Sequence, residues 1–191
     1  MTTTTLQQPN KPPVLYTFIM ILSTLRVINQ VIRGYMIPPR VNPNKSVNVG
    51  FRCWPIDLDS FIHMNNSKYL QVAELTRWRT IVPILPYIVS KGLLLLVAEN
   101  NIQYLRPIDP FQRYIVSTSV SVDENEDKWI YYKHVFEEHP DDLRGRDNST
   151  QPITYAVVQM KGIVKEVNGK TVKPSTLINK SKFFKEWFSV K

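Results

Sequence analysis

The sequence predicts an α+β fold in which one central helix lies against a curled antiparallel sheet. Residues 114–122 alternate apolar side chains or threonine with mostly serine, which is typical of a half-buried strand. Residues 66–81 repeat apolar side chains at helical spacing, and Asn65 or Asn66 can cap the helix. Asn168-Gly169 separates two strand-like segments and favours a hairpin. Because 43% of the 191 residues are hydrophobic, one domain can build its own core.

The remaining elements follow in the order strand, helix and about four antiparallel strands. Tyr69, Val72, Ala73 and Thr76 give the helix its mostly apolar face, and Pro83 limits its far end. Pro83 and Pro86 should then break the segment that follows. Further strands are predicted over residues 47–53, 93–98 as a buried type, 102–105, 129–136, 153–167 and 170–172. A last helix is predicted over residues 176–188.

The first 40 residues form a separate region, followed by a domain over residues 41–173 and a basic, aromatic C-terminal helix over residues 174–191. Residues 14–25 carry no charge but are too few to cross a bilayer, which takes about 20 residues. Helical spacing continues to residue 37, so one hydrophobic, then amphipathic helix is predicted. Three interpretations stay open: a membrane anchor through residues 14–37, a mitochondrial-type targeting helix, or a helix that covers the domain.

Composition excludes several kinds of site. The only cysteine, Cys53, cannot form an intramolecular disulfide or a cysteine-cluster zinc site, and we expect no metal centre. The net charge is +8, and the first 56 residues contain six lysines and arginines but no acidic residue. Such basic ends suit membrane headgroups, acidic partners or phosphate-bearing ligands. We expect no nucleic-acid partner, because no recognised binding motif accompanies the charge.

One short stretch concentrates groups that carry chemistry. Asp57 and Asp59 are followed by His63 and then by Asn65 and Asn66 at the predicted helix start. A carboxylate near a helix start can act as nucleophile or general base, while N–H groups of the first turn can hold an oxyanion. These two parts suffice for thioester hydrolysis without a metal. The alternative is a capped loop in which Asp59 and Asn65 bind backbone amides and His63 lies in the core.

This stretch resembles a known family. The pattern Asp-x-x-x-His-Met-Asn-Asn-x-x-Tyr-Leu, followed by Glu74 and Arg77, is similar to hotdog-fold acyl-CoA thioesterases of the 4-hydroxybenzoyl-CoA thioesterase type. Residues 102–108, Ile-Gln-Tyr-Leu-Arg-Pro-Ile, match the second strand of that family. The resemblance covers residues 47–167 and is closest to the branch of thioesterase superfamily member six, which also carries an amino-terminal hydrophobic segment. Glu74 and Arg77, one helical turn apart, are expected to form a surface or interface ion pair.

The resemblance implies a hydrolase of acyl-CoA thioesters, with the coenzyme A thioester as substrate and no cofactor. It places the catalytic set on Asp59, His63, Asn65 and Asn66, in a homodimer that binds thioesters where two subunits meet. Two departures favour an alternative, a non-catalytic structural subunit of a membrane complex, for example a mitochondrial one. Phe61 replaces an asparagine of the related plant thioesterases, and their strand glutamate is missing. Localisation is expected at an intracellular membrane, mitochondrial or endoplasmic reticulum.

Overall fold

The computed structural model describes residues 46–122, 127–143, 151–176 and 189–190, together with residues 21, 24, 25, 28, 29 and 32. Most of the predicted helix over residues 14–37 and of the C-terminal helix over residues 176–188 therefore lies outside the described residues. Within the described part, no helix combines the length and the hydropathy needed to span a bilayer.

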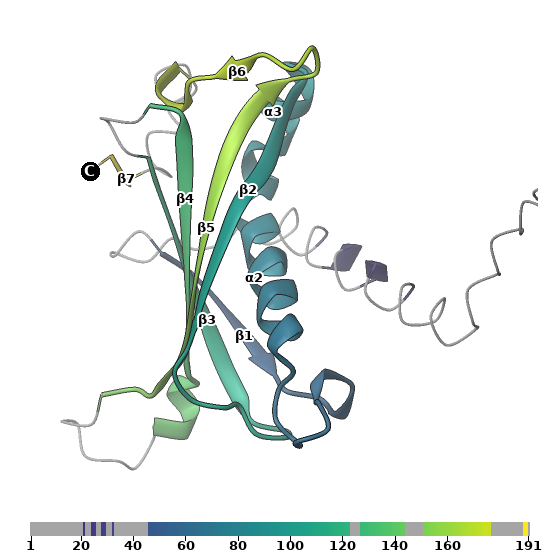
Figure 1. The fold of residues 1–191 in the computed structure, drawn as a ribbon, viewed down its shortest axis with the longest axis vertical. Helices are drawn as coiled ribbons and strands as arrows, with labels where there is room; N and C mark the ends of the chain where they lie inside the picture. Colours follow the sequence, from purple (N-terminus) through teal and green to yellow (C-terminus); the bar gives the residue numbers. More distant parts are fainter. Residues whose placement is uncertain are drawn as a thin grey trace, which may run out of the picture.

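A seven-stranded sheet forms one layer of the domain (Figure 1). The five long strands lie in the order β1-β3-β4-β5-β2, and each pairs antiparallel with its neighbour. β6 pairs antiparallel with the end of β5, and β7 pairs in parallel with β3. The bounds are β1 Ser46–Arg52, β2 Leu93–Tyr104, β3 Arg113–Val122, β4 Trp129–Glu138, β5 Thr154–Glu166, β6 Thr171–Val172 and β7 Ser189–Val190.

Helix α2, Asn66–Ile81, lies along one face of this sheet and has the predicted bounds (Figure 1). The Asn65 side chain caps it by accepting a hydrogen bond of 2.9 Å from the Ser67 N–H. Pro83 limits α2 as predicted, because the helix ends at Ile81. The segment beyond it is divided into a 3₁₀ turn, Val82–Ile84, and the short helix α3, Leu85–Ser90. A proline stands in the first turn of each, where its missing N–H is not needed. Further 3₁₀ turns are Pro55–Asp57 and Pro140–Leu143.

The core lies between α2 and the sheet. Tyr69, Ala73 and Thr76 of the helix are buried, as their spacing predicted. They meet an aromatic layer in which the Phe136 ring centroid lies 5.2 Å from that of Tyr69 and 6.0 Å from that of Tyr114. Such ring pairs add about 0.5–1.5 kcal/mol each beyond the area they bury. This packing fixes the amino-terminal end of α2 beside the loops at one end of the sheet.

Strand β2 differs from its prediction. The sequence suggests two pieces, the first of them buried, whereas the structure has one strand of 12 residues with a β-bulge between Val97 and Glu99. Among the described residues β2 pairs with β5 alone, at the edge of the sheet. Its burial alternates: Leu93 is buried, whereas Leu94 and Leu96 point to the opposite face and are each 44% exposed. A run of leucines predicts a strand that is buried on both faces, but one face of this strand is partly open to solvent.

Candidate active site

The loop before α2 forms a tight hairpin of its own. Leu58 and Met64 form an isolated antiparallel bridge, and the Asp59 N–H donates to the His63 carbonyl over 2.9 Å. Ile62 at the tip has a φ of 62°, in the left-handed region that isoleucine rarely adopts. This hairpin holds residues 59–63 at the amino-terminal end of α2.

Asp59 directs one carboxylate oxygen into its own loop. Its Oδ1 accepts hydrogen bonds from the N–H groups of Phe61 at 2.9 Å and His63 at 3.4 Å. Its Oδ2 accepts none from the described residues, and the side chain is partly exposed. The carboxylate is therefore fixed in position and keeps one oxygen available to a ligand or a water molecule.

Asp57 has a different environment from Asp59. Its side chain is buried, and Oδ2 accepts a hydrogen bond of 3.0 Å from the Trp54 N–H. Oδ1 lies 3.8 Å from Nζ of Lys68 in the first turn of α2, and the Asp57 carbonyl accepts from the Asn65 N–H over 2.8 Å. Asp57 thus ties the loop to the helix start.

His63 lies at the surface, not in the core as the capped-loop alternative expects. Its side chain is 47% exposed, and Nε2 lies 3.8 Å from Oδ1 of Asp109 in the β2–β3 connection. The hairpin turns this side chain outward while Met64, the next residue, is buried. The imidazole is therefore open to solvent at the edge of the site.

The helix start supplies the electrophilic part of the site. The Asn65 side chain accepts a hydrogen bond from the Ser67 N–H, and the Asn65 carbonyl accepts one from the Lys68 N–H. The N–H of Asn66 makes no hydrogen bond to any other described residue, as expected for the first position of a helix. The Asn66 carbonyl accepts a hydrogen bond of 3.2 Å from the Tyr104 hydroxyl, which joins the helix start to the end of β2.

A cavity of about 330 Å³ brings most of these groups together. It contains three of the four predicted site residues, whereas the fourth, Asn65, serves as the helix cap and does not line it. Its floor is aromatic, and burial raises the pKa of Tyr69 to about 12, so that phenol stays neutral. The lining residues are Asp59, Phe61, His63, Met64, Asn66, Tyr69, Tyr104, Leu105, Arg106 and Pro107.

Sequence reasoning assigned Tyr69 only to the core and gave no role to Tyr104. Their ring centroids lie 5.3 Å apart, nearly perpendicular, beneath the cavity. The 102–108 motif was the signal that could have pointed to Tyr104. The predicted ion pair between Glu74 and Arg77 is present, with Nε of Arg77 2.8 Å from the Glu74 carboxylate and outside the cavity lining. Arg77 itself is only 5% exposed.

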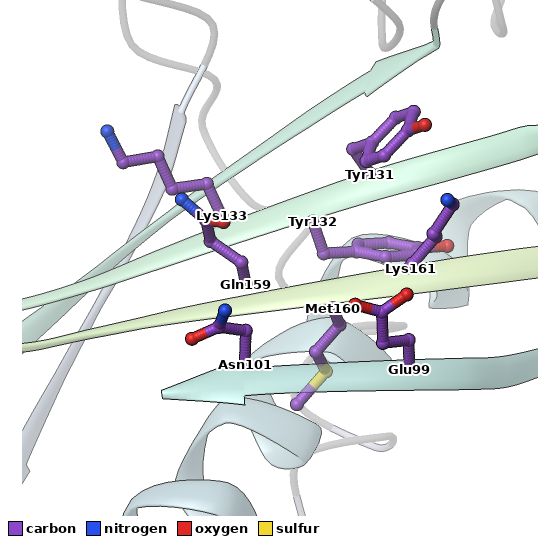
Figure 2. Close-up of a pocket in the computed structure, with 8 residues that line it drawn as sticks. All are labelled: Glu99, Asn101, Tyr131, Tyr132, Lys133, Gln159, Met160 and Lys161. Atoms are coloured by element: carbon purple, nitrogen blue, oxygen red, sulfur yellow. The ribbon is translucent and has the colours of Figure 1, made fainter. Parts of the chain in front are cut away.

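A second cavity, also about 330 Å³, lies over strands β2, β4 and β5 (Figure 2). Tyr131, Lys133, Gln159 and Lys161 approach it from neighbouring strands, and Lys161 Nζ lies 4.6 Å from the Trp129 ring centroid. Lys133 alternates with His134, which contacts α2, so these side chains occupy the sheet face away from the helix. No helix start lines this cavity, and the Glu99 carboxylate there is remote from Asp59 and Asn66.

The thioesterase-like superfamily matches residues 53–187, which include the loop, α2 and all the long strands except β1. The chain belongs to this superfamily. No curated protein sequence matches it.

Solved structures agree with this assignment. YbaW, a probable thioesterase from Escherichia coli, is 15% identical with a TM-score of 0.59, covering 70% of this chain and 93% of YbaW. A mutant 4-hydroxybenzoyl-CoA thioesterase complexed with 4-hydroxybenzoyl-CoA is 8% identical with a TM-score of 0.58, covering 76% and 99%. Slr0204, a 1,4-dihydroxy-2-naphthoyl-CoA thioesterase from Synechocystis, is 14% identical with a TM-score of 0.52, covering 67% and 88%. These similarities confirm the predicted hotdog fold.

Proposed function

We propose that this protein hydrolyses acyl-CoA thioesters at the cavity of Asp59 and Asn66. The observation that carries the proposal is their juxtaposition: a fixed carboxylate with one available oxygen and an unbonded N–H at a helix start line the same cavity. Membership of the thioesterase-like superfamily and the two CoA thioesterases above support the substrate class.

The reaction follows from these two groups. The thioester carbonyl oxygen accepts a hydrogen bond from the Asn66 N–H, whose position at the helix start favours developing negative charge. Asp59 either removes a proton from an attacking water or attacks the acyl carbon itself. With Asp59 as base, the water oxygen bonds to the acyl carbon, the C–S bond breaks, and the proton that Asp59 took passes to the departing sulfur of coenzyme A. With Asp59 as nucleophile, the C–S bond breaks as an acyl–Asp59 anhydride forms, and a water molecule then hydrolyses the anhydride and supplies the proton of the coenzyme A thiol. The side chains Tyr69 and Tyr104 enclose the acyl group, and the exposed Arg106 suits the phosphates of coenzyme A.

A thiol-release assay over acyl-CoAs of graded chain length tests the proposal. Asp59→Asn keeps the shape of the side chain, removes its charge, and should lower the hydrolysis rate by about 10²-fold or more, the usual contribution of a positioned acid–base group. Asp142→Asn is a matched control, because its carboxylate pairs with Arg113 and neither residue lines the cavity. A wild-type protein inactive on every chain length would refute the proposal.

The alternative, a non-catalytic subunit of a membrane complex, has an observation of its own. By the resemblance, the strand glutamate of the related plant thioesterases falls near Gln103 in this chain, and the nearby Glu99 lines the other cavity. Under this alternative the protein would co-purify in mild detergent with a fixed set of partners and would leave acyl-CoAs intact. The two candidates therefore give opposite results in the thiol-release assay.

We also propose a homodimer that pairs along β2, because this edge strand of 12 residues leaves its backbone groups unpaired on one side.

We further propose that residues 14–37 hold the protein at a mitochondrial or endoplasmic-reticulum membrane. Deleting residues 1–40 should release the chain from membranes while the domain still unfolds cooperatively. Loss of cooperative unfolding would instead indicate that this segment covers the domain.

A further inference from the structure

β1 ends, and β2 turns into β3, at the same end of the domain (Figure 1). Among the described residues of 46–176, eleven large apolar side chains are exposed, and six of them lie in the loops at this end, over residues 54–62 and 105–111. Single exposed apolar residues are ordinary, but a cluster of them marks an interaction surface. We call this cluster the loop patch: Trp54, Ile56, Phe61, Ile62, Leu105 and Phe111.

The two loops of the loop patch are joined to each other. The Phe111 N–H donates to the Cys53 carbonyl over 2.8 Å, and the Met64 N–H donates to the Ile108 carbonyl over 3.0 Å. The Trp54 and Phe111 rings meet edge to face with centroids 6.3 Å apart. The apolar side chains therefore form one surface.

Backbone conformation keeps two of these side chains in solvent. Ile62 and Phe111 are the non-glycine residues with positive φ in the described part of the chain, at 62° and 61°. Both are exposed, Ile62 by 66% and Phe111 by 54%. A left-handed conformation is unfavourable for large side chains and above all for a β-branched one, and such strain clusters at functional surfaces. Here it places isoleucine and phenylalanine where a solvated loop would carry asparagine or glycine.

Two exposed arginines flank the loop patch. Arg52 and Arg106 form no ion pair with the described residues, and Arg52 lies 5.9 Å from the Trp54 ring centroid. Of the nearby carboxylates, Asp57 is buried beside Lys68 and Asp59 lines the cavity, whereas Asp109 is exposed. Aromatic and aliphatic side chains beside unpaired arginines are the composition of proteins that bind the headgroup region of a bilayer.

We propose that the loop patch docks on a bilayer containing anionic phospholipid, with Ile62 and Phe111 inserted among the acyl chains. Arg52 is the last of the six lysines and arginines in the acid-free first 56 residues, and Trp54 and Ile56 of the loop patch follow it within that segment. Docking in this orientation turns the mouth of the Asp59 cavity, which Phe61 and Leu105 line, toward the lipid. The proposal concerns lipid contact and does not depend on thioester hydrolysis.

Site-specific fluorescence on the full chain tests this docking. The native thiol will not compete for label, because Cys53 is fully buried and burial raises its pKa to about 11. An environment-sensitive fluorophore is attached to Ile62→Cys and, as a matched control, to Val167→Cys. Val167 is apolar and 74% exposed in the β5–β6 turn at the opposite end of the sheet. The labelled proteins are mixed with phosphatidylcholine vesicles with and without phosphatidylserine.

The label at position 62 should shift to the blue and be quenched by lipids brominated on their acyl chains, more strongly with phosphatidylserine and less at high salt. The label at position 167 should not change. Equal responses at both positions, or no response at position 62, would overturn the proposal. A blue shift that needs no vesicles and grows with protein concentration would show that a second copy covers the loop patch, and would overturn it too.

Discussion

Protonation of His134 should destabilise the folded domain, because the surroundings of this buried imidazole offer no acceptor for a second ring proton. His134 lies on β4 with no exposed surface. Its Nδ1 lies 3.0 Å from Oγ1 of Thr76 on α2 and 2.9 Å from Oγ1 of Thr118 on β3. Nε2 is buried without a hydrogen-bond partner among the described residues.

The neutral form of His134 follows from this geometry. The Thr76 hydroxyl donates to the Ala73 carbonyl over 2.9 Å, so its oxygen faces Nδ1 as an acceptor and places the single ring proton on Nδ1. A second proton would have to sit on Nε2, where it finds no acceptor. Burial, and then the charge of the nearby Arg77, lower the pKa of His134 from 6.5 to about 3.

The effect on stability has a definite sign. Above pH 6.5 the imidazole is neutral in both the folded and the unfolded state and contributes nothing to the pH dependence. Below pH 6.5 the unfolded chain binds a proton that the folded protein refuses until about pH 3, so the free energy of unfolding falls as the pH falls. The slope approaches about 1.36 kcal/mol per pH unit once the unfolded imidazole is mostly protonated, so acidification from pH 6.5 to 4.5 costs about 2 kcal/mol.

Urea unfolding followed by circular dichroism at pH 6.5, 5.5 and 4.5 measures this loss. His134→Asn keeps a polar atom near the Nδ1 position for the two threonines but cannot be protonated in this range. The variant leaves a void and is less stable at pH 6.5, yet it should lose about 2 kcal/mol less than the wild type on acidification. Subtracting the two curves removes the carboxylates, which both proteins share. Equal pH slopes would refute the reasoning.

Three further predictions concern the loop, the helix and the edge strand. Asn65→Ala removes the helix cap and should lower the free energy of unfolding by about 1 kcal/mol in urea. Asp57→Asn leaves Lys68 without its buried partner and should cost about 1–3 kcal/mol, while the folded fraction keeps most of its hydrolysis rate; a loss as large as that of Asp59→Asn would contradict the division of roles. Leu96→Lys should make the proposed dimer monomeric in light scattering, and an unchanged mass would place the contact elsewhere.

Local signals in the sequence predicted the elements that depend on local physics. Asn65 and Asn66 marked the start of α2, because an asparagine side chain can accept from its free N–H groups, and Asn65 is the residue that does so. Asn168-Gly169 marked the β5–β6 hairpin, where Gly169 has a φ of 89°. The burial of β2 could not be predicted in the same way. Its leucines fit a buried or an edge strand equally well, and long-range pairing decides between them.

The same distinction between local and long-range physics applies to the candidate site. Its residue types could be predicted, because a carboxylate before a helix start has a chemical meaning whatever surrounds it. Their arrangement could not. The outward turn of His63 depends on the left-handed backbone at Ile62, and the sequence offers no glycine or asparagine to signal it. The aromatic floor, Tyr69 and Tyr104, comes together only when the end of β2 reaches the helix start.

The pair Asp57 and Asp59 shows how the site depends on a residue outside it. Asp57 binds the Trp54 N–H, faces Lys68 and accepts from the Asn65 N–H, so it fixes both ends of the loop to the first turn of α2. With both ends fixed, the position of Asp59 relative to the Asn66 N–H is set before any ligand arrives. In the proposed reaction this preorganisation matters, because a carboxylate and an oxyanion donor assist the same thioester only at a fixed separation. In the proposed reaction, the buried Asp57 therefore holds the loop in position and the more open Asp59 reacts.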